Sequence, residues 1–131
     1  MNIIVDIGNS RAKFYAVEGR RVVGEHIAES ATEEWLKEVL QNYPSAERAI
    51  VASTRGDTDR VAEILQKAIP FVLPFSSGVT AVPIANDYLT PATLGPDRLA
   101  AAVGAWAMYP DSDIMVVDFG YSIFNNQRID H

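Results

Sequence analysis

Cysteine is absent from the 131 residues of the chain, and histidine occurs only twice. Disulfide bonds and thiolate-bound metals are therefore excluded, and the lack of cysteine is compatible with a cytoplasmic protein. His26 and His131 do not have the spacing of metal ligands. The sequence thus offers no thiolate or paired-histidine metal site.

Basic residues are also scarce, with 11 Lys and Arg against 17 Asp and Glu and a net charge of -6 at pH 7. Binding to the phosphates of nucleic acid needs clustered Lys and Arg, so the charge disfavours nucleic acid as a partner. Neither a long apolar run nor a basic leader is present, which predicts no membrane span and no signal peptide. We expect a single cytoplasmic domain that buries about two-thirds of its unfolded surface.

An apolar run followed by Asp-x-Gly-x-Ser occurs twice, at residues 3–10 and at residues 115–122. Such runs, rich in β-branched residues and closed by Gly, are typical of strands buried on both faces. Asp at the strand end can hold a cation, and the next Gly lets the backbone turn tightly and present amides to an anion. Ordinary turns are the alternative, because Asp and Gly are common there. The repetition favours two facing loops that grip a metal and a polyphosphate.

The first part of the chain predicts three strands joined by tight turns, over residues 2–8, 11–17 and 21–27. Turns this short favour antiparallel hairpins. Ser30 and Glu33 then have the spacing of a capping box, which predicts the start of an amphipathic helix.

Helices and strands alternate in the remainder. The first helix is predicted to end at Pro44, and a strand follows over 49–52. Next come a helix from about Thr58 to before Pro70 and a strand over 71–73. A last helix runs from Pro96 to about Tyr109 and leads to the second Asp-x-Gly strand. Trp35 and Trp106 fall on apolar helix faces and are predicted core residues. The whole is a mixed α/β sheet flanked by helices.

This order of elements resembles the ribonuclease-H-like fold of the actin, sugar-kinase and Hsp70 ATPase superfamily. Within it, the chain resembles the type III pantothenate kinases, whose pattern is DxGN(T/S)xxK, then GxDR, then VDxGT. The matching residues are Asp6-Ile7-Gly8-Asn9-Ser10-Arg11-Ala12-Lys13, Tyr88, Gly95-Pro96-Asp97-Arg98 and Val116-Val117-Asp118-Phe119-Gly120.

The resemblance implies ATP-dependent phosphorylation of pantothenate to 4'-phosphopantothenate, the first step of coenzyme A biosynthesis. It implies ATP, magnesium and a monovalent cation, potassium or ammonium, as cofactors. It also implies a homodimer and no association with a membrane.

On the same resemblance, residues 6–13 bind the ATP phosphates, with Asp6 organising magnesium through them and Asp118 holding the monovalent cation. The nucleotide contacts extend to Tyr121, although the family has Thr there. From the residues alone, the Asp6 side chain could instead form an Asx-type turn hydrogen bond with Asn9 or Ser10. Lys13 could be a solvated surface residue.

The resemblance places pantothenate on Tyr88, Gly95, Pro96, Asp97 and Arg98. Asp97 is implied to be the catalytic base that receives the proton of the pantothenate hydroxyl, and the planar fork of Arg98 suits the pantothenate carboxylate. Taken alone, Asp97 could merely stabilise its helix, and Arg98 could pair with an acidic neighbour such as Asp87.

Family members continue into a second domain of the same kind. We expect residues 1–112 to form the N-terminal actin-like ATPase domain and residues 113–131 the first strand or strands of a truncated second one. Such a chain would be a fragment, a frame-shifted product or a natural half-protein. We expect it to be weakly active or inactive, because catalysis by positioning needs groups from both domains.

Two other functions stay open. The chain could be a non-catalytic accessory protein of this family that resembles a transcriptional regulator, which Tyr121 and the short length favour. It could also be another small-molecule kinase of the superfamily, acting on a sugar or an acid.

Overall fold

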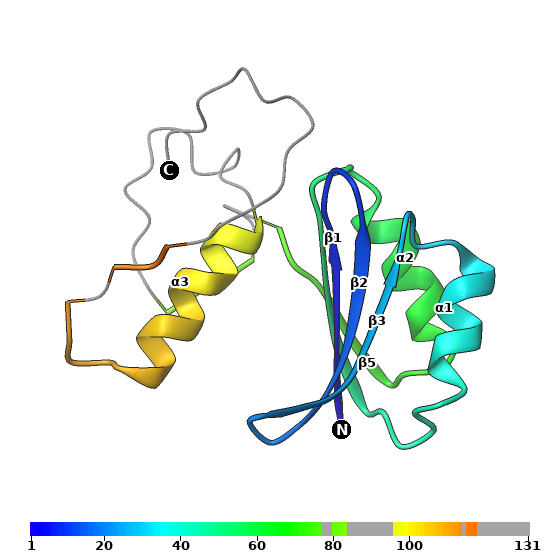
Figure 1. Ribbon diagram of the computed structural model, residues 1–131, viewed down its shortest axis with the longest axis horizontal. Helices are drawn as coiled ribbons and strands as arrows, with labels where there is room; N and C mark the ends of the chain where they lie inside the picture. The colour runs from blue at the N-terminus through cyan, green and yellow to red at the C-terminus, as the bar shows by residue number, and fades with distance from the viewer. Residues whose placement is uncertain (77–79, 84–95, 114, 118–131) are drawn as a thin grey trace.

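The computed structural model describes residues 1–76, 80–83, 96–113 and 115–117. Figure 1 shows a sheet with helices on both sides, α1 (Glu33–Leu40) and α2 (Thr58–Gln66) on one side and α3 (Pro96–Met108) on the other. The strands are β1 (Asn2–Ile7), β2 (Ala12–Glu18), β3 (Arg21–Ala28), β4 (Arg48–Ser53) and β5 (Phe71–Pro74).

The five strands lie in the order β3-β2-β1-β4-β5. The pairs β1–β2 and β2–β3 are antiparallel hairpins, whereas β1–β4 and β4–β5 are parallel. The predicted mixed α/β sheet flanked by helices is confirmed, and the finer ribonuclease-H-like assignment stays a prediction. No helix within the described ranges is long and apolar enough to cross a membrane.

The core lies between the sheet and the pair α1 and α2. Alternate residues of each strand point to this face, so a register slip of one residue would turn the whole apolar set towards solvent. The larger buried side chains are Ile3, Val5, Ile7, Phe14 and Val51 from the sheet, and Leu36, Val39, Val61, Ile64 and Leu65 from the two helices. The apolar pattern of the sequence therefore fixes both the register and the covered face.

The opposite face of the sheet is more polar near the end of β1 and more exposed elsewhere. By the same alternation, Asp6 and Lys13 lie on this face, opposite each other on β1 and β2. Leu99 of α3 is buried, and α3 contacts β4. Phe71 and Leu73 of β5 stay 69% and 47% exposed, so α3 does not cover this edge of the sheet.

The predicted capping box at the start of α1 is wrong. The cap is Thr32, whose hydroxyl accepts a hydrogen bond from the backbone amide of Trp35 at 3.1 Å. Glu33 is already the first helical residue and pairs with Lys37 and Lys67 instead. Ser30 therefore lies too early to cap, because a cap must bond the amides two or three residues later in the first turn.

The described part of the second Asp-x-Gly run does not form the predicted strand. Residues 115–117 have no strand structure, and Met115 is 87% exposed. An apolar run becomes a strand only when another strand takes its backbone hydrogen bonds, and none of the described strands lies beside it. The rest of this motif, residues 118–122, lies outside the described residues, as does the side chain of Trp106.

An aromatic cluster joins the hairpins to α1. Phe14 stacks on Tyr43, with 5.8 Å between ring centroids, and meets Trp35 and His26 edge-on. The Tyr43 hydroxyl and His26 Nε2 are 2.7 Å apart and hydrogen-bonded. Trp35 is half-buried against the core, as predicted, and His26 has a structural role in this cluster.

Gly24 of β3 is required by this cluster, because a Cβ atom there would collide with the ring and hydroxyl of Tyr43. Tyr43 cannot easily retreat, since it is held by Phe14 and His26. We expect Gly24→Ala to lower the free energy of unfolding by about 1–3 kcal/mol, as measured by urea denaturation followed by circular dichroism.

Gly104→Ala is the matched control, because Gly104 is exposed within α3 and a Cβ there would meet nothing within 4 Å. This change should be neutral or stabilising by up to about 1 kcal/mol. Equal stability of Gly24→Ala and the unmodified chain would contradict the packing described for Tyr43.

Candidate functional site

The candidate site lies where β1 and β4 end side by side. Their parallel register pairs Asp6 with Ala52 and Ile7 with Ser53. The carboxyl ends of neighbouring parallel strands meet at one edge of a sheet, which is where open α/β sheets bind ligands. Two connections leave from this edge: residues 8–11, here called the glycine turn, and residues 54–57, here called the arginine loop.

The glycine turn joins β1 to β2 and holds the predicted phosphate-binding residues. The Gly8 amide donates to the Arg11 carbonyl at 2.9 Å and closes the turn. The amides of Asn9 and Ser10 donate to no backbone carbonyl among the described residues. The Ser10 hydroxyl is buried and has no hydrogen-bond partner within the described part of the chain. A buried hydroxyl left unpaired costs free energy, so this atom is a candidate ligand contact.

The backbone conformation at Gly8 does not by itself require glycine. Its φ angle is not positive, and a Cβ atom there would be 3.6 Å from the Arg11 carbonyl oxygen, an ordinary contact. Neither the backbone nor the packing therefore demands glycine at this position. Glycine keeps this position free of a side chain, so a ligand could approach the backbone closely.

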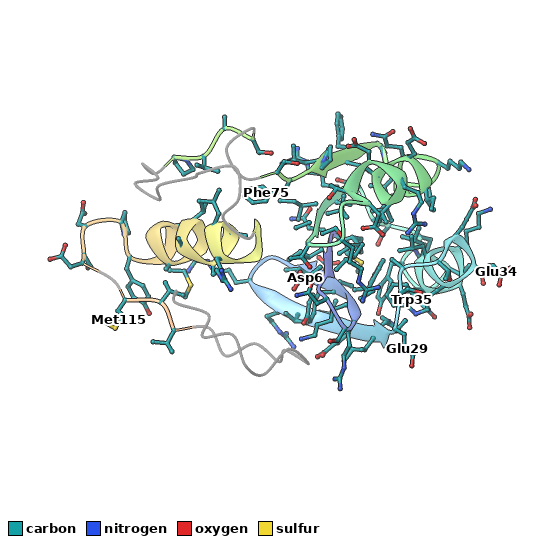
Figure 2. All side chains as sticks on the ribbon, turned by 90° about the horizontal axis from the view of Figure 1, so that it is seen from above. Asp6, Glu29, Glu34, Trp35, Phe75 and Met115 are labelled. Atoms are coloured by element: carbon teal, nitrogen blue, oxygen red, sulfur yellow. The ribbon has the colours of Figure 1, made fainter. Side chains whose placement is uncertain are left out.

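Asp6 and Lys13 form a cross-strand pair on the α3 side of the sheet. Figure 2 shows Asp6 at the side of the sheet that faces α3. Tyr15 lies two residues beyond Lys13 on the same face, and its pKa is raised by burial and by the nearby carboxylates of Glu25 and Asp6. The Tyr15 phenol therefore stays protonated at neutral pH and is a neighbour of Asp6 that the sequence analysis did not identify.

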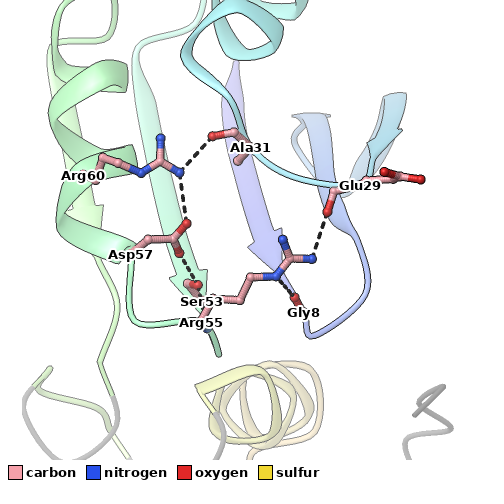
Figure 3. Close-up of polar contacts among 7 residues, drawn as sticks. All are labelled: Gly8, Glu29, Ala31, Ser53, Arg55, Asp57 and Arg60. Carbon is pink, nitrogen blue, oxygen red and sulfur yellow. Dashed lines mark hydrogen bonds and ion pairs between the residues drawn. The ribbon is translucent and has the colours of Figure 1, made fainter. Parts of the chain in front are cut away.

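The arginine loop was not predicted as part of any site, yet it contacts the glycine turn directly. The Thr54 amide donates to the Ile7 carbonyl at 2.9 Å. The Arg55 Nε donates to the Gly8 carbonyl at 2.6 Å, and its Nη2 donates to the Glu29 carbonyl at 2.9 Å (Figure 3). The only local signal was a polar Ser-Thr-Arg-Gly-Asp run directly after a buried strand.

Asp57 anchors the far end of this loop at the start of α2. Its carboxylate accepts from the Ser53 hydroxyl at 2.5 Å and pairs with Arg60 at 3.0 Å. Burial opposes ionisation of Asp57, but the hydrogen bonds from Ser53 and Arg60 and the charge of Arg60 outweigh it and hold the pKa below its usual value. Arg60 also donates to the Ala31 carbonyl at 3.0 Å, which ties α2 to the β3–α1 connection.

The predicted substrate residues are only partly described. Asp97 and Arg98 lie in the first turn of α3, which begins near the end of the sheet where β1 ends (Figures 1 and 2). Arg98 is half-buried. The structure does not describe Tyr88, Gly95 or the side chains of Pro96 and Asp97. The same holds for Asp87, the alternative partner of Arg98, and for Asp118 and Tyr121 of the predicted cation and nucleotide contacts.

No group of three or more His, Cys, Asp or Glu residues that could hold a metal occurs in the part of the chain that the structure describes. The role expected of Asp6, which organises a cation together with oxygen atoms of a ligand, stays a prediction. Oxygen ligands of that kind are what magnesium prefers.

A separate hollow of about 810 Å³ lies at the opposite end of the sheet. It is mostly apolar, and its charged wall residue, Arg48, lies over the Phe71 ring at 6.0 Å from the centroid. Asn2, Ile4, Ile50 and Leu73 also line it. None of the predicted site residues whose side chains the structure describes lines this hollow.

Comparison with known proteins identifies the family. The family model described as type III pantothenate kinase matches residues 2–124. Type III pantothenate kinases of Azobacteroides pseudotrichonymphae and Phocaeicola vulgatus are 32% and 37% identical to the chain, over 94% and 92% of its length. The enzyme of Bacteroides fragilis is 35% identical over 94% of the chain.

The chain thus belongs to the type III pantothenate kinase family, as its motifs predicted. It spans about half the length of the curated relatives it matches, 49% of the first two and 50% of the third. The matched region includes the glycine turn, the arginine loop and α3.

The lowered pKa of Asp57 predicts an acid-sensitive contribution to stability. Because the pKa is lower in the folded than in the unfolded chain, this contribution is present above about pH 4. It is lost as the pH falls through the folded pKa. We expect Asp57→Asn to lower stability at pH 7 by about 0.5–1.5 kcal/mol and to flatten the decline below pH 4, as measured by urea denaturation between pH 2.5 and 7.

Asp59→Asn is the matched control, since Asp59 is exposed in the same first turn of α2 and loses the same charge. It should keep the acid decline of the unmodified chain. An Asp57→Asn variant with an unchanged decline would show that Ser53 and Arg60 do not hold the Asp57 carboxylate.

Proposed function

We propose that this chain is the N-terminal half of a type III pantothenate kinase, in which the glycine turn and the arginine loop form one wall of the ATP site. One observation carries the proposal: both connections leave the sheet at the paired ends of β1 and β4, in a region that matches this family. The complete enzyme transfers the γ-phosphate of ATP to pantothenate and yields 4'-phosphopantothenate.

The glycine turn supplies the groups for the ATP phosphates. The amides of Asn9 and Ser10 and the Ser10 hydroxyl are donors that no described residue uses. Lys13, one strand over, adds a positive charge on the Asp6 face. In a chain with a net charge of -6, these groups make a local site for a polyphosphate.

Asp6 is the candidate organiser of magnesium. A carboxylate is the kind of oxygen ligand that magnesium prefers, with phosphate oxygens and water completing its coordination. When bound, magnesium neutralises charge that builds up on the phosphates during transfer. Asp118 is the candidate ligand for a monovalent cation, potassium or ammonium.

The first turn of α3 supplies the groups for pantothenate. The Asp97 carboxylate orients the pantothenate hydroxyl and takes its proton, and the Arg98 guanidinium binds the pantothenate carboxylate. The new P–O bond forms at this hydroxyl oxygen while the bond from the γ-phosphorus to the bridging oxygen of ADP breaks. Positioning suffices here, since proton removal from the alcohol is late in such a loose transition state. Tyr88, Gly95 and Pro96 are proposed to complete this pocket.

The second wall of the site would come from a second domain. The relatives are about twice as long as this chain, which leaves room in them for a second domain. A domain end near residue 112, with residues 113–131 as the start of the second domain, stays a prediction. On this proposal the chain alone binds ATP weakly and turns over slowly or not at all. The ribonuclease-H-like fold, a homodimer and a cytoplasmic location stay predictions from the family.

The role of Gly8 gives the sharpest test of the ATP site. We expect Gly8→Ala to leave the thermal unfolding temperature nearly unchanged, because its Cβ atom has room within the protein. The added methyl group would stand where a phosphate approaches, so the dissociation constant for magnesium-ATP should rise by about tenfold or more. Isothermal titration calorimetry of the 131-residue chain measures it.

Gly104→Ala serves as the control and should bind magnesium-ATP like the unmodified chain. If magnesium-ATP binds equally well to Gly8→Ala, the glycine turn does not bind phosphate and the proposed function loses its main support. A non-catalytic protein of the family predicts no binding in any variant.

A further inference from the structure

We infer that Arg55 is a positioning residue that holds the glycine turn in the orientation needed to bind phosphate. This inference rests on the proposed function, because it takes the glycine turn as the phosphate site. It concerns a residue outside the three motifs that define the family resemblance.

The guanidinium of Arg55 bridges two backbone segments, the glycine turn and the residue that follows β3. Its Nε donates to the Gly8 carbonyl at 2.6 Å and its Nη2 to the Glu29 carbonyl at 2.9 Å (Figure 3). Hydrogen bonds from a charged donor are stronger than neutral ones, and the planar fork fixes both acceptors relative to each other. The carbonyl of Gly8 belongs to the same peptide unit as the Asn9 amide. Holding that carbonyl therefore fixes the direction in which the Asn9 amide points.

Thr54 holds the other side of the same turn. Its amide donates to the Ile7 carbonyl at 2.9 Å, and its hydroxyl lies 3.3 Å from that carbonyl and 3.2 Å from the Asn9 Oδ1. One hydroxyl proton cannot fully serve both acceptors. Thr54 therefore secures mainly the end of β1, while Arg55 secures the turn beyond it.

The backbone of Arg55 is fixed by hydrogen bonds that involve Ser53 and Asp57. Its own amide donates to the Ser53 hydroxyl at 3.0 Å, and that hydroxyl donates to Asp57. Gly56 has a φ angle of +78°, which favours glycine and lets the loop fold back onto α2. The loop is thus fixed to the first turn of α2, and its arginine is directed at the glycine turn.

The positioning role can be separated from folding because Arg55 is exposed. If its side chain is removed, water can hydrogen-bond the carbonyls of Gly8 and Glu29, so the cost to global stability is small. Local order of the glycine turn should suffer more than the fold. Opening of the turn is measurable through exchange of the Gly8 amide, which donates to the Arg11 carbonyl.

The test compares Arg55→Ala with Arg60→Ala in the 131-residue chain. Arg60 has the same charge, lies in the same cluster and contacts Ala31 and Asp57, but not the glycine turn. Hydrogen exchange of the Gly8 amide by NMR and magnesium-ATP binding by calorimetry are measured in both. We expect Arg55→Ala to speed exchange and weaken binding by about tenfold each, and Arg60→Ala to change either by less than about threefold.

Arg55→Lys adds a second criterion. An ammonium group carries the same charge but cannot bridge two carbonyls in a fixed plane, so it should restore only part of the slow exchange. Full restoration by Lys would mean that charge, and not the fork, is what matters, and would overturn the inference.

Two further results would overturn it. Exchange in Arg55→Ala no faster than in Arg60→Ala would show that Arg55 does not order the turn. Weaker ATP binding with unchanged exchange would show that Arg55 contacts phosphate directly instead of positioning the turn. If the unmodified chain does not bind magnesium-ATP, the proposed function fails, while the exchange data still decide whether Arg55 orders the turn.

Discussion

Parallel pairing of β1 with β4 is the constraint on which the rest of the structure depends. It buries Ile3, Val5 and Val51 on one face, so the core under α1 and α2 exists only in this register. The same register brings Ile7 opposite Ser53, so the two connections that follow must leave side by side. Stability and the candidate site therefore share one cause, and a strand slip would destroy both.

The glycine turn and the arginine loop have different hydrogen-bonding roles at this edge of the sheet. The glycine turn offers donors, with the Ser10 hydroxyl and the amides of Asn9 and Ser10 unused among the described residues. In the arginine loop, the guanidinium of Arg55 donates to the backbone carbonyls of Gly8 and Glu29 and so holds the glycine turn in place. Such a division suits phosphate binding, because preorganised dipoles need not be reordered when the ligand arrives. On the proposed function, this arrangement gives an acidic chain a local site for an anion.

The sequence predicted best those features that depend on interactions between residues close together in the chain. Alternation of apolar residues predicted β1, β2 and β3 within one residue at each end, and Pro96 marked the start of α3. The ends expected at Pro44 and Pro70 were too late, because α1 ends at Leu40 and α2 at Gln66. Capping was misassigned to Ser30 because two candidate caps lay close together and only the backbone geometry selects Thr32. The run at 115–117 read as a strand, since an apolar pattern cannot show whether a partner strand is available. Arg55 was missed because its contacts, to residues 47 and 26 positions earlier, exist only after β4 has paired with β1.

The central claim is that the paired ends of β1 and β4 form the phosphate wall of a pantothenate kinase. The most direct measurement is an NMR titration of the 15N-labelled 131-residue chain with magnesium-ATP and then with pantothenate. The account predicts that ATP shifts the amides of Asn9, Ser10, Thr54 and Arg55, and that pantothenate shifts those at the start of α3. Shifts confined to the apolar hollow around Ile4 and Leu73, or no shifts with either compound, would contradict it.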